Sequence, residues 1–493
     1  MNKMDIGIEY SQENYVQKFA GALTDSMFAA DPRQSTRSRN YFNPIIQLLS
    51  LMFDYSMNSK TQLNVKAYSL FGQRNMVIAD PNLATNADTI IKALGSYAPR
   101  VINRDYYTSY TVDARIIRKY NLFGQESALS GGLKYSNIST DRRQNGVGST
   151  GTDFDLTLTG DYGINLLFRT INYGVFLENL FRVTDRLSIT PGIRYDYLHT
   201  TQNGTEYSVY NDYRPVSLST SRNILLGEIG AQYKITENIN VYGNFSQAYR
   251  PILYANLIVG SSTAVINPNL KDASGYNLDI GIRGKIRNIL NFDVSGFKLY
   301  YGNRIGNITL TDTAGNPYSY TTNAGDAMTN GVEAYLEIHL LNFKNEHTNS
   351  DLSIFSSYAY NDAKYLNGTS GKVNLTGKAL EDAPQYISRS GINYTLKNIS
   401  ATFYYSAVGG SWSDANNTPA TGKNPGVGYV PPYQVMDLAM TYKFLGNYMI
   451  RMGVNNLTDK KYFTRRTETL VYLGKGVLPG DGRSIYFTLG AKF

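Results

Sequence analysis

Three groups of residues have types that could support chemistry, but their spacing argues against it. Residues 146–151 (GVGSTG) fit the G-x-G-x-x-G pattern of phosphate-binding loops. That pattern needs a strand before it and a helix after it, whereas this segment follows Asp141-Arg142-Arg143 in a polar stretch with no helical periodicity. We therefore predict a flexible loop here rather than a phosphate site.

The histidines and one acidic pair give little support to metal binding or catalysis. His199, His339 and His347 fall in different predicted hairpins without ligand spacing, so surface or membrane-interface positions are expected. Glu381 and Asp382 could form an acid–base pair, but adjacent strand residues face opposite ways, which favours a place in a loop or at a strand start. No Ser/His/Asp arrangement stands out, and we predict that the protein is not an enzyme.

Composition narrows the class of protein. The 493 residues include 42 tyrosines and 44 glycines but no cysteine. The absence of cysteine excludes disulfides, thiolate nucleophiles and cysteine metal ligands. No apolar run reaches the ~18 residues of a transmembrane helix, and residues 1–11 lack the apolar segment of a signal peptide. The basic residues behind the net charge of +8 form no cluster, so no nucleic-acid partner is expected.

The elements that would position any site are β-strands. Apolar and polar residues alternate with a period of two along nearly the whole chain. Tyrosines gather towards the strand ends, which predicts the aromatic girdles of a membrane barrel, although strand propensity alone is an alternative explanation. The alternation is clear in 187–197, 225–234, 276–283 and 484–493.

The connections distinguish a membrane barrel from a soluble sandwich. Tight turns, such as 183–186 and 445–447, alternate strictly with long polar stretches, for example near 137–167 and 200–220. Outer-membrane barrels have short periplasmic turns and long extracellular loops, whereas Greek-key sandwiches follow no such rule. We therefore predict an all-β fold, a transmembrane antiparallel β-barrel.

The count of predicted strands is about 18, with room for roughly ten residues in each. A lone strand at residues 4–10 precedes a long loop and therefore runs outward, and a last strand at 483–493 runs inward. Eight hairpins lie between them, near 41–72, 103–137, 168–199, 222–249, 275–302, 329–360, 384–408 and 433–456.

Several segments, in order, resemble the barrel of TonB-dependent outer-membrane receptors. Residues 241–251 (VYGNFSQAYRP) are similar to the Y-x-N-x-S-x-x-Y/F-R-x-P segment of that family, and residues 377–384 (GKALEDAP) to its G-x-x-L-x-x-A-P segment. Residues 453–462 (GVNNLTDKKY) resemble a late-strand box, and residues 30–40 (ADPRQSTRSRN) resemble receptors of the ferric-citrate type. At 272–274, Asp-Ala-Ser departs from the Pro-Glu-x that is common there.

The resemblance implies a receptor for a ferric chelate, ferric citrate or a siderophore complex, in the outer membrane of a Gram-negative bacterium. Such receptors have a signal peptide, a TonB-contacting box, a plug and a barrel of roughly 22 strands, so about four strands (22 − 18 = 4) would lie outside this chain. We expect residues 1–493 to be the C-terminal part of that barrel, incomplete at its N-terminus and without plug, TonB box or signal peptide. Two unpaired sheet edges and an open or gapped barrel would follow.

Arginines are the ligand contacts that the resemblance implies, because ferric citrate and similar chelates are anionic and guanidinium groups bind carboxylates with paired hydrogen bonds. The candidates are Arg33, Arg37 and Arg39 in the first long loop and Arg250 at an outer strand end. Solvated loop charges, or contacts with anionic lipid, are the alternative for each.

The resemblance also implies partners. Tyr486 and Phe493 are expected to form the C-terminal signal for barrel assembly. The expected partners are outer-membrane lipid, the barrel assembly machinery and, for the full-length protein, the TonB complex; the protein is expected to be a monomer. The ferric chelate is the transported ligand, and no covalently bound cofactor and no metal site are expected.

Two other classes of protein stay open. A passive porin of about 18 strands would need residues 4–10 to pair with 483–493, and the former is shorter than the ~9–11 residues that span a membrane. A secreted all-β adhesin does not explain the terminal Phe493 or the alternation of short and long connections.

Overall fold

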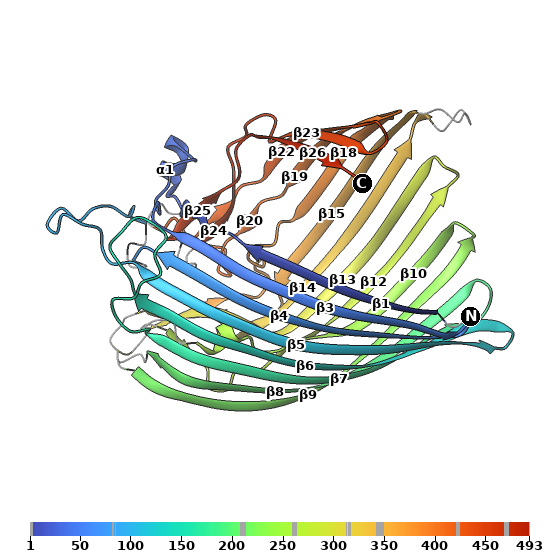
Figure 1. Cartoon of the computed structure of the whole chain (residues 1–493), viewed down its shortest axis with the longest axis horizontal. Coiled ribbons are helices and arrows are strands. Elements are labelled where there is room, and N and C mark those ends of the chain that lie inside the picture. The colour runs from blue at the N-terminus through green and yellow to red at the C-terminus, as the bar shows by residue number, and fades with distance from the viewer. Residues whose placement is uncertain are drawn as a thin grey trace.

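The computed structural model describes residues 3–80, 83, 85–207, 213–258, 264–311, 313, 317–341, 350–420, 424–467 and 473–492. Most of these residues belong to one large sheet that curls into a deep trough (Figure 1). Two short helical segments, α1 (Asp25–Ala30) and the 3₁₀ helix η2 (Tyr254–Leu257), lie in the connections. Within these ranges, none of the helices has the length and apolar character needed to cross a membrane.

The large sheet is an antiparallel meander in which each long strand pairs with the next one along the chain. Its long strands are β1 (Lys3–Asn14), β3 (Tyr41–Asn58), β4 (Thr61–Ile78), β5 (Val101–Leu122), β6 (Gln125–Val147), β7 (Ile164–Arg182), β8 (Leu187–Tyr207), β9 (Tyr213–Thr236), β10 (Ile239–Arg250), β12 (Ala273–Ile286), β13 (Leu290–Thr311), β14 (Pro317–His339), β15 (Ser350–Tyr365), β18 (Tyr386–Leu396), β19 (Ile399–Val408), β22 (Tyr433–Phe444), β23 (Tyr448–Asn455) and β26 (Ser484–Ala491).

Short strands accompany this sheet. β2 (Gln17–Lys18) pairs with β3, and β11 (Ala264–Ile266) pairs parallel with β14. Three small sheets form within the long connections: β16 (Thr369–Ser370) with β17 (Val373–Asn374), β20 (Ser411–Trp412) with β21 (Tyr429–Val430), and β24 (Phe463–Thr467) with β25 (Gly476–Pro479).

The pairing confirms all eight predicted hairpins, from β3/β4 to β22/β23. Two of their turns show how the sequence makes them tight. Phe123 and Gly124 have φ of 52° and 80°, and Leu445 and Gly446 have φ of 49° and 74°. Two successive positive φ angles belong to the type I′ turn, whose twist matches that of the paired strands.

Several strands run further into the predicted loops than the sequence indicates. The stretches 137–167 and 200–220 were expected to be loops, yet β6 extends to Val147. Likewise β8 continues to Tyr207, and β9 begins at Tyr213. β1 has 12 residues rather than seven, so the argument that it is too short to span a membrane was wrong. Alternation fades where both faces of a strand are polar or covered by loops, while backbone pairing continues.

The two faces of the sheet differ in polarity. On β7, Tyr173, Val175 and Leu177 lie on the outer face and are exposed, while Thr170 and Asn172 lie on the inner face. The Tyr173 ring neighbours Tyr135 of β6 and Tyr197 of β8, with ring centroids 5.3 and 6.4 Å apart. These three tyrosines lie near the middle of their strands, so they do not test the prediction of aromatic girdles at the strand ends.

The sheet is open between its first and last strands. In the ranges described above, β1 pairs only with β3 and β26 only with β23. Apolar side chains on these edge strands are unusually exposed, with Ile8 at 73% and Ile485 at 79%. This agrees with the expectation of two unpaired edges and an open or gapped barrel.

A small apolar core lies on the inner face near the loop end. Ile164, Leu166 and Phe168 of β7 are buried there. The connection after β10 folds inward over them, so that the Tyr254 ring stacks on Phe168 with centroids 4.4 Å apart. The inward fold of this connection narrows the trough at its loop end.

Candidate ligand-binding site at the loop end

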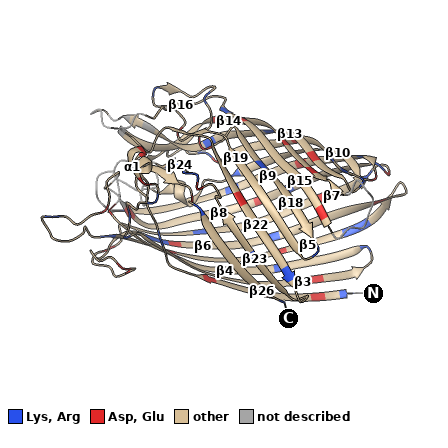
Figure 2. Ribbon diagram, turned by 90° about the horizontal axis from the view of Figure 1, so that it is seen from above, with Lys and Arg blue, Asp and Glu red and all other residues tan. Residues whose placement is uncertain are grey.

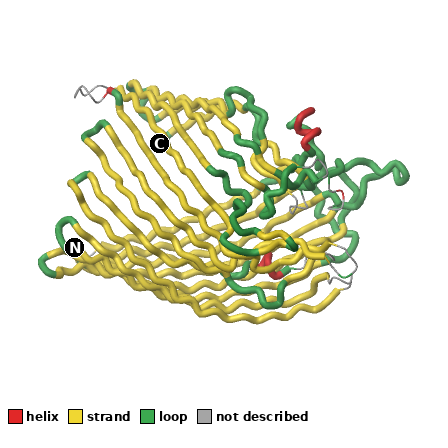
Figure 3. Tube along the Cα trace, turned by 180° about the vertical axis from the view of Figure 1, so that it is seen from behind, coloured by secondary structure: helices red, strands yellow, loops and turns green. Residues whose placement is uncertain are grey.

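The long connections gather at one end of the trough, opposite the short turns (Figure 3). This arrangement concentrates irregular backbone and polar side chains where the inner face opens. Acidic and basic residues are otherwise interspersed along the strands, without one dominant patch (Figure 2). The loop end is therefore the place to look for a ligand site.

The first and the last long connections dock onto each other across the gap between β1 and β26. The backbone N–H groups of Leu23 and Val477 each donate to the other residue's carbonyl, at 3.0 and 2.8 Å. The Arg466 guanidinium donates to both carboxylate oxygens of Asp25, at 2.7 and 3.0 Å. We call this contact of residues 19–40 with residues 456–467 and 473–483 the loop clasp.

Two predicted ligand contacts, Arg37 and Arg39, are buried and fully engaged by the protein. Arg39 is 1% exposed and forms a two-pronged ion pair with Asp88, at 2.7 and 2.8 Å, below the ring of Tyr97. Arg37 is 2% exposed and donates to the carbonyls of Thr36 and Asn86. Burial lowers the pKa of Arg37. The structure thus places both residues where they hold loops together, away from an accessible surface.

The other two predicted arginines are accessible. Arg33 is exposed and donates to Asp459 at 2.7 Å, which adds a rim contact to the loop clasp. Arg250 is exposed at the end of β10 and donates to the Tyr301 hydroxyl at 2.6 Å. A ligand role for these two stays a prediction that their positions permit.

The predicted assembly residues are placed only in part. Tyr486 lies on β26 opposite Gly453 of β23, where any larger side chain would meet the tyrosine ring. Phe493 lies outside the described residues. Their role as an assembly signal stays a prediction.

The G-x-G-x-x-G segment is a structural loop. Gly146 and Val147 end β6, and no helix follows them. The carbonyls of Thr150 and Gly151 accept hydrogen bonds from Arg39, so the segment faces a cation of the protein itself. Nearby, the Thr157 backbone N–H lowers the pKa of Asp155 to about 2.

The histidines form no metal site in the described part of the chain. His199 contacts the Ser221 hydroxyl at 2.9 Å, and His339 contacts Asp351 at 3.1 Å. His347 lies outside the described residues.

The acidic pair lies in a cavity. Glu381 and Asp382 both line a polar space of about 700 Å³, which we call the loop cavity. Their carboxylates share it because Asp382 has a φ of 56°, outside strand geometry, so the rule of opposite faces does not apply. The cavity also contains Arg304 of β13 and Arg465 of β24. Its other lining residues are Asn307, Ser370, Arg466, Thr467 and residues between 413 and 419 and between 424 and 427.

The sequence reading missed a charged row on the inner face. Arg74 of β4, Asp105 of β5 and Arg142 of β6 are direct cross-strand neighbours. Both arginines contact the buried Asp105 carboxylate, and the Arg74 Nε is buried without a hydrogen-bond partner in the described structure. Two guanidinium groups on one carboxylate leave a positive charge at the mouth of the trough. Only the register of three long strands reveals this row.

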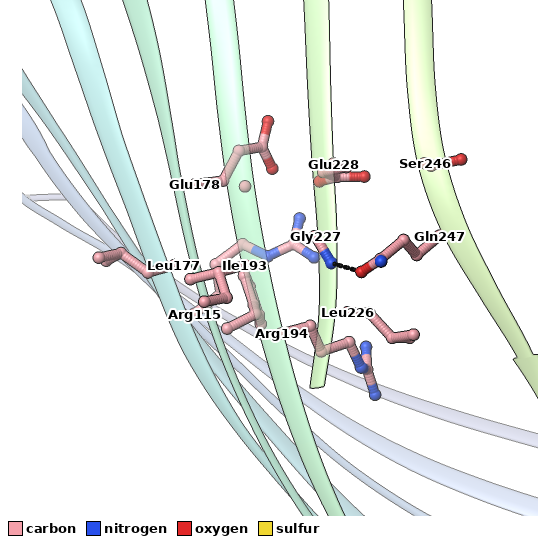
Figure 4. A pocket seen from close by; sticks show the side chains of 12 residues that line it. Arg115, Leu177, Glu178, Ile193, Arg194, Leu226, Gly227, Glu228, Ser246 and Gln247 are labelled. Atoms are coloured by element: carbon pink, nitrogen blue, oxygen red, sulfur yellow. Dashed lines mark hydrogen bonds between the residues drawn. The ribbon is translucent and has the colours of Figure 1, made fainter. Parts of the chain in front are cut away.

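A smaller cavity of about 370 Å³ lies on the wall where β9 and β10 separate. Beyond the pair Glu228–Ser246 these strands no longer bond to each other, and the Gln247 side chain accepts from the Gly227 N–H at 2.7 Å (Figure 4). Arg115, Arg194 and acidic side chains surround it. It lies closer to the short turns than the loop cavity does.

The fold and this loop-end arrangement define a class: a wide antiparallel sheet with an apolar outer face and a polar interior below long loops. The sequence model of the family described as TonB dependent receptor-like, beta-barrel, matches residues 4–457. The chain belongs to this family, which confirms the resemblance seen in its motifs.

Relatives of similar sequence have related names. An uncharacterized TonB-dependent receptor of Haemophilus influenzae is 25% identical over 251 residues, 50% of this chain and 65% of that protein. The metal-pseudopaline receptor CntO of Pseudomonas aeruginosa is 22% identical over 303 residues, 61% of this chain and 38% of the receptor. The chain thus spans 65% and 38% of the lengths of these two relatives.

Solved structures show the same fold. The unliganded ferric citrate transporter FecA superposes with a TM-score of 0.79 at 18% identity, covering 100% of this chain and 68% of that one. The siderophore receptor PiuA of Acinetobacter baumannii superposes with a TM-score of 0.73 at 15% identity, covering 100% of this chain and 72% of that one.

Proposed function

We propose that the protein acts as an outer-membrane receptor that takes up a ferric chelate, ferric citrate or a siderophore complex, with energy supplied through the TonB complex. The observation that supports this most is the two-faced sheet with its long connections at one end, in a member of the TonB-dependent receptor family. An apolar outer face suits the bilayer, and antiparallel pairing satisfies the backbone there.

The chemistry of uptake explains why such coupling is needed. The outer membrane has no ATP supply, so a scarce chelate must be concentrated by force transmitted from the inner membrane. In this proposal the chain forms the barrel wall and the loops. The plug and the region that contacts TonB are expected in the full-length protein, because the family resemblance implies them. Lipid, the assembly machinery and a monomeric state belong to the same proposal.

The ligand contacts we propose are arginines whose donors are only partly engaged by the protein. Arg33 and Arg250 are exposed with one described partner each, and Arg74 and Arg142 share the single carboxylate of Asp105, whereas Arg37 and Arg39 are enclosed by loop carbonyls and Asp88. The row on the inner face is the strongest of these because its net charge is positive.

A binding experiment tests this assignment. The triple variant Arg74→Gln/Asp105→Asn/Arg142→Gln, which leaves no buried carboxylate unpaired, should bind ferric citrate at least about tenfold more weakly, since charge-assisted hydrogen bonds contribute ~1.5–3 kcal/mol each. Arg287→Gln, in the turn at the opposite end, is the matched control and should bind normally. Unchanged affinity in the triple variant would remove the row from the site.

The passive porin is not favoured. It requires β1 to pair with β26, and no such pairing exists among the described residues. Steady single-channel conductance of the protein in a planar bilayer would support the passive-porin function instead.

A further inference from the structure

The outer face of the sheet has a groove where β12, β13, β14 and β15 lie side by side. Its volume is about 410 Å³. Its floor is Gly296 of β13, which lies between Ile280 of β12 and Val332 of β14 in the register. These two neighbours are 65% and 48% exposed, which places all three residues on the apolar outer face. A glycine between two large side chains leaves a gap in that surface.

The space above Gly296 is open. A Cβ atom added there would have a single heavy atom within 4 Å apart from its chain neighbours, the Gly331 carbonyl oxygen at 3.9 Å. Leu278 and Tyr360 belong to the more distant lining of the groove. Atoms that line an empty space lose their dispersion contacts, so hydrocarbon that enters the groove restores them. The groove therefore suits an acyl chain.

A lysine lies beside this apolar groove. Lys298 is two residues from Gly296 on β13, opposite Leu278, and its side chain is exposed on the same face. Among the described residues it has neither an ion pair nor a hydrogen bond. Asp362, which also lines the groove, is already paired with Lys364 at 2.8 Å. A lysine on a lipid-facing surface is costly unless its ammonium group reaches a polar or anionic partner.

The neighbouring tyrosines indicate the height of Lys298 in the bilayer. Tyr276, near the loop end of β12, stacks on Tyr300 of β13 with ring centroids 5.3 Å apart. This pair lies one step closer to the loop end than Lys298, on the same face. Tyrosine rings on a barrel surface favour the headgroup level. Lys298 is then within reach of lipid phosphates, and Gly296 lies deeper, beside the acyl chains.

We propose that this groove, the lipid groove, binds a phosphate-bearing lipid of the outer leaflet. The Lys298 ammonium group donates to the phosphate, and one acyl chain lies over Gly296. A lipid without a phosphate lacks the charged contact, and a phosphate without an acyl chain leaves the groove empty. The inference goes beyond the proposed uptake function, because it assigns a lipid to one place on the outer face.

The experiment measures binding to the detergent-folded protein by native mass spectrometry, with three probes. Dioleoyl phosphatidic acid has both chains and phosphate, dioleoylglycerol has the chains alone, and glycerol phosphate has the phosphate alone. We expect phosphatidic acid to bind about tenfold more tightly than dioleoylglycerol, because only the phosphate forms a charge-assisted hydrogen bond. Glycerol phosphate should bind at least about tenfold more weakly than phosphatidic acid, because it buries no hydrocarbon.

Two variants separate the two contacts. Lys298→Gln should weaken phosphatidic acid about tenfold, to the level of dioleoylglycerol, and leave dioleoylglycerol unchanged. Gly296→Leu fills the groove and should weaken both lipids by about fourfold, the equivalent of one buried methylene group. Arg287→Gln, in the turn between the same two strands, is the charge control. Gly131→Leu, on the outer face of β6 opposite the exposed Leu177, is the glycine control, and both controls should bind as the wild type does.

Wild-type affinity for phosphatidic acid in Lys298→Gln, or for both lipids in Gly296→Leu, would overturn the inference. Glycerol phosphate that binds as tightly as phosphatidic acid would also overturn it, because the site would then take free phosphate rather than a lipid. The measurements involve no chelate, so they test the lipid groove separately from the proposed uptake function.

Discussion

Arg465 and Arg466 are neighbours on β24, yet they belong to two different regions of the loop end. Arg466 faces the loop clasp, where its side chain is 4% exposed and bound to Asp25 and to the carbonyls of Pro425 and Tyr429. Arg465 faces the loop cavity with a 47% exposed side chain and one ion pair. Two adjacent residues of one strand thus differ in role: Arg466 holds loops together, whereas Arg465 is exposed to solvent in the loop cavity.

The first long connection repeats this contrast. Arg33 is at the accessible rim, whereas Arg37 and Arg39, four and six residues later, are enclosed by loop carbonyls and Asp88. Residue type and loop position therefore do not identify ligand contacts. A ligand contact is identified by its exposure and by the hydrogen-bond donors that the protein itself does not use.

The largest effect is expected from Arg39→Met. Removing one partner of a buried ion pair leaves Asp88 charged and unpaired, which should lower the free energy of unfolding by about 3–5 kcal/mol. Urea titration of the detergent-folded protein measures this. The double variant Arg39→Met/Asp88→Leu should recover most of the loss; a single variant as stable as the wild type would contradict the structural role.

A smaller effect is expected from Asp25→Asn in the loop clasp. The variant removes the carboxylate that holds Arg466 and should cost about 1–2 kcal/mol, because Asp25 itself is half-exposed. Limited proteolysis should cut residues 19–40 faster than in the wild type. Resistance equal to that of the wild type would show that the clasp does not depend on this ion pair.

Asp382→Asn tests the other ion pair of β24. The pair of Asp382 with Arg465 is half-exposed and contributes roughly 0.5–1 kcal/mol, so the variant should change the free energy of unfolding by no more than about 1 kcal/mol. A loss in urea titration as large as that of Arg39→Met would show that Asp382 is a structural residue of the loop end.

The same residue predicts a pH dependence. Burial raises the pKa of Asp382, with Glu381 adding to the effect and Arg465 opposing it. The folded protein therefore takes up this proton at a higher pH than the unfolded chain, and Asp382 should stabilise the fold as the pH falls towards the ordinary value of ~4. Urea titrations at several pH values should show this contribution in the wild type and not in Asp382→Asn.

The smallest effect is expected from Arg33→Ala. Its ion pair with Asp459 is exposed to solvent, so the urea midpoint should stay within experimental error of the wild type. The variant serves as the stability control for Arg39→Met. A loss as large as that of Arg39→Met would erase the distinction between rim and buried arginines.

The hairpins could be predicted from the sequence because alternation and turn chemistry are local. The residues of the segments 183–186 and 445–447 predict tight turns, and the strands on either side of each turn pair as expected. Strand ends were less predictable, since β6 and β9 continue into polar stretches where pairing with a neighbour replaces the apolar signal.

The sites depend on contacts that no local pattern encodes. Arg74, Asp105 and Arg142 meet through strand register, and Arg39 meets Asp88 across 49 residues of sequence. The acidic pair Glu381–Asp382 was predicted to lie in a loop or at a strand start, and it does lie outside the named strands. That both residues line one cavity, where Asp382 has a positive φ, is a feature that only the structure shows.

The most direct test of the account measures uptake of radiolabelled ferric citrate, together with a panel of siderophore complexes, by cells that produce the protein from its native gene. The account predicts saturable uptake of at least one chelate that disappears when TonB is deleted or the proton motive force is collapsed. Uptake that continues without TonB would contradict it and indicate passive diffusion instead.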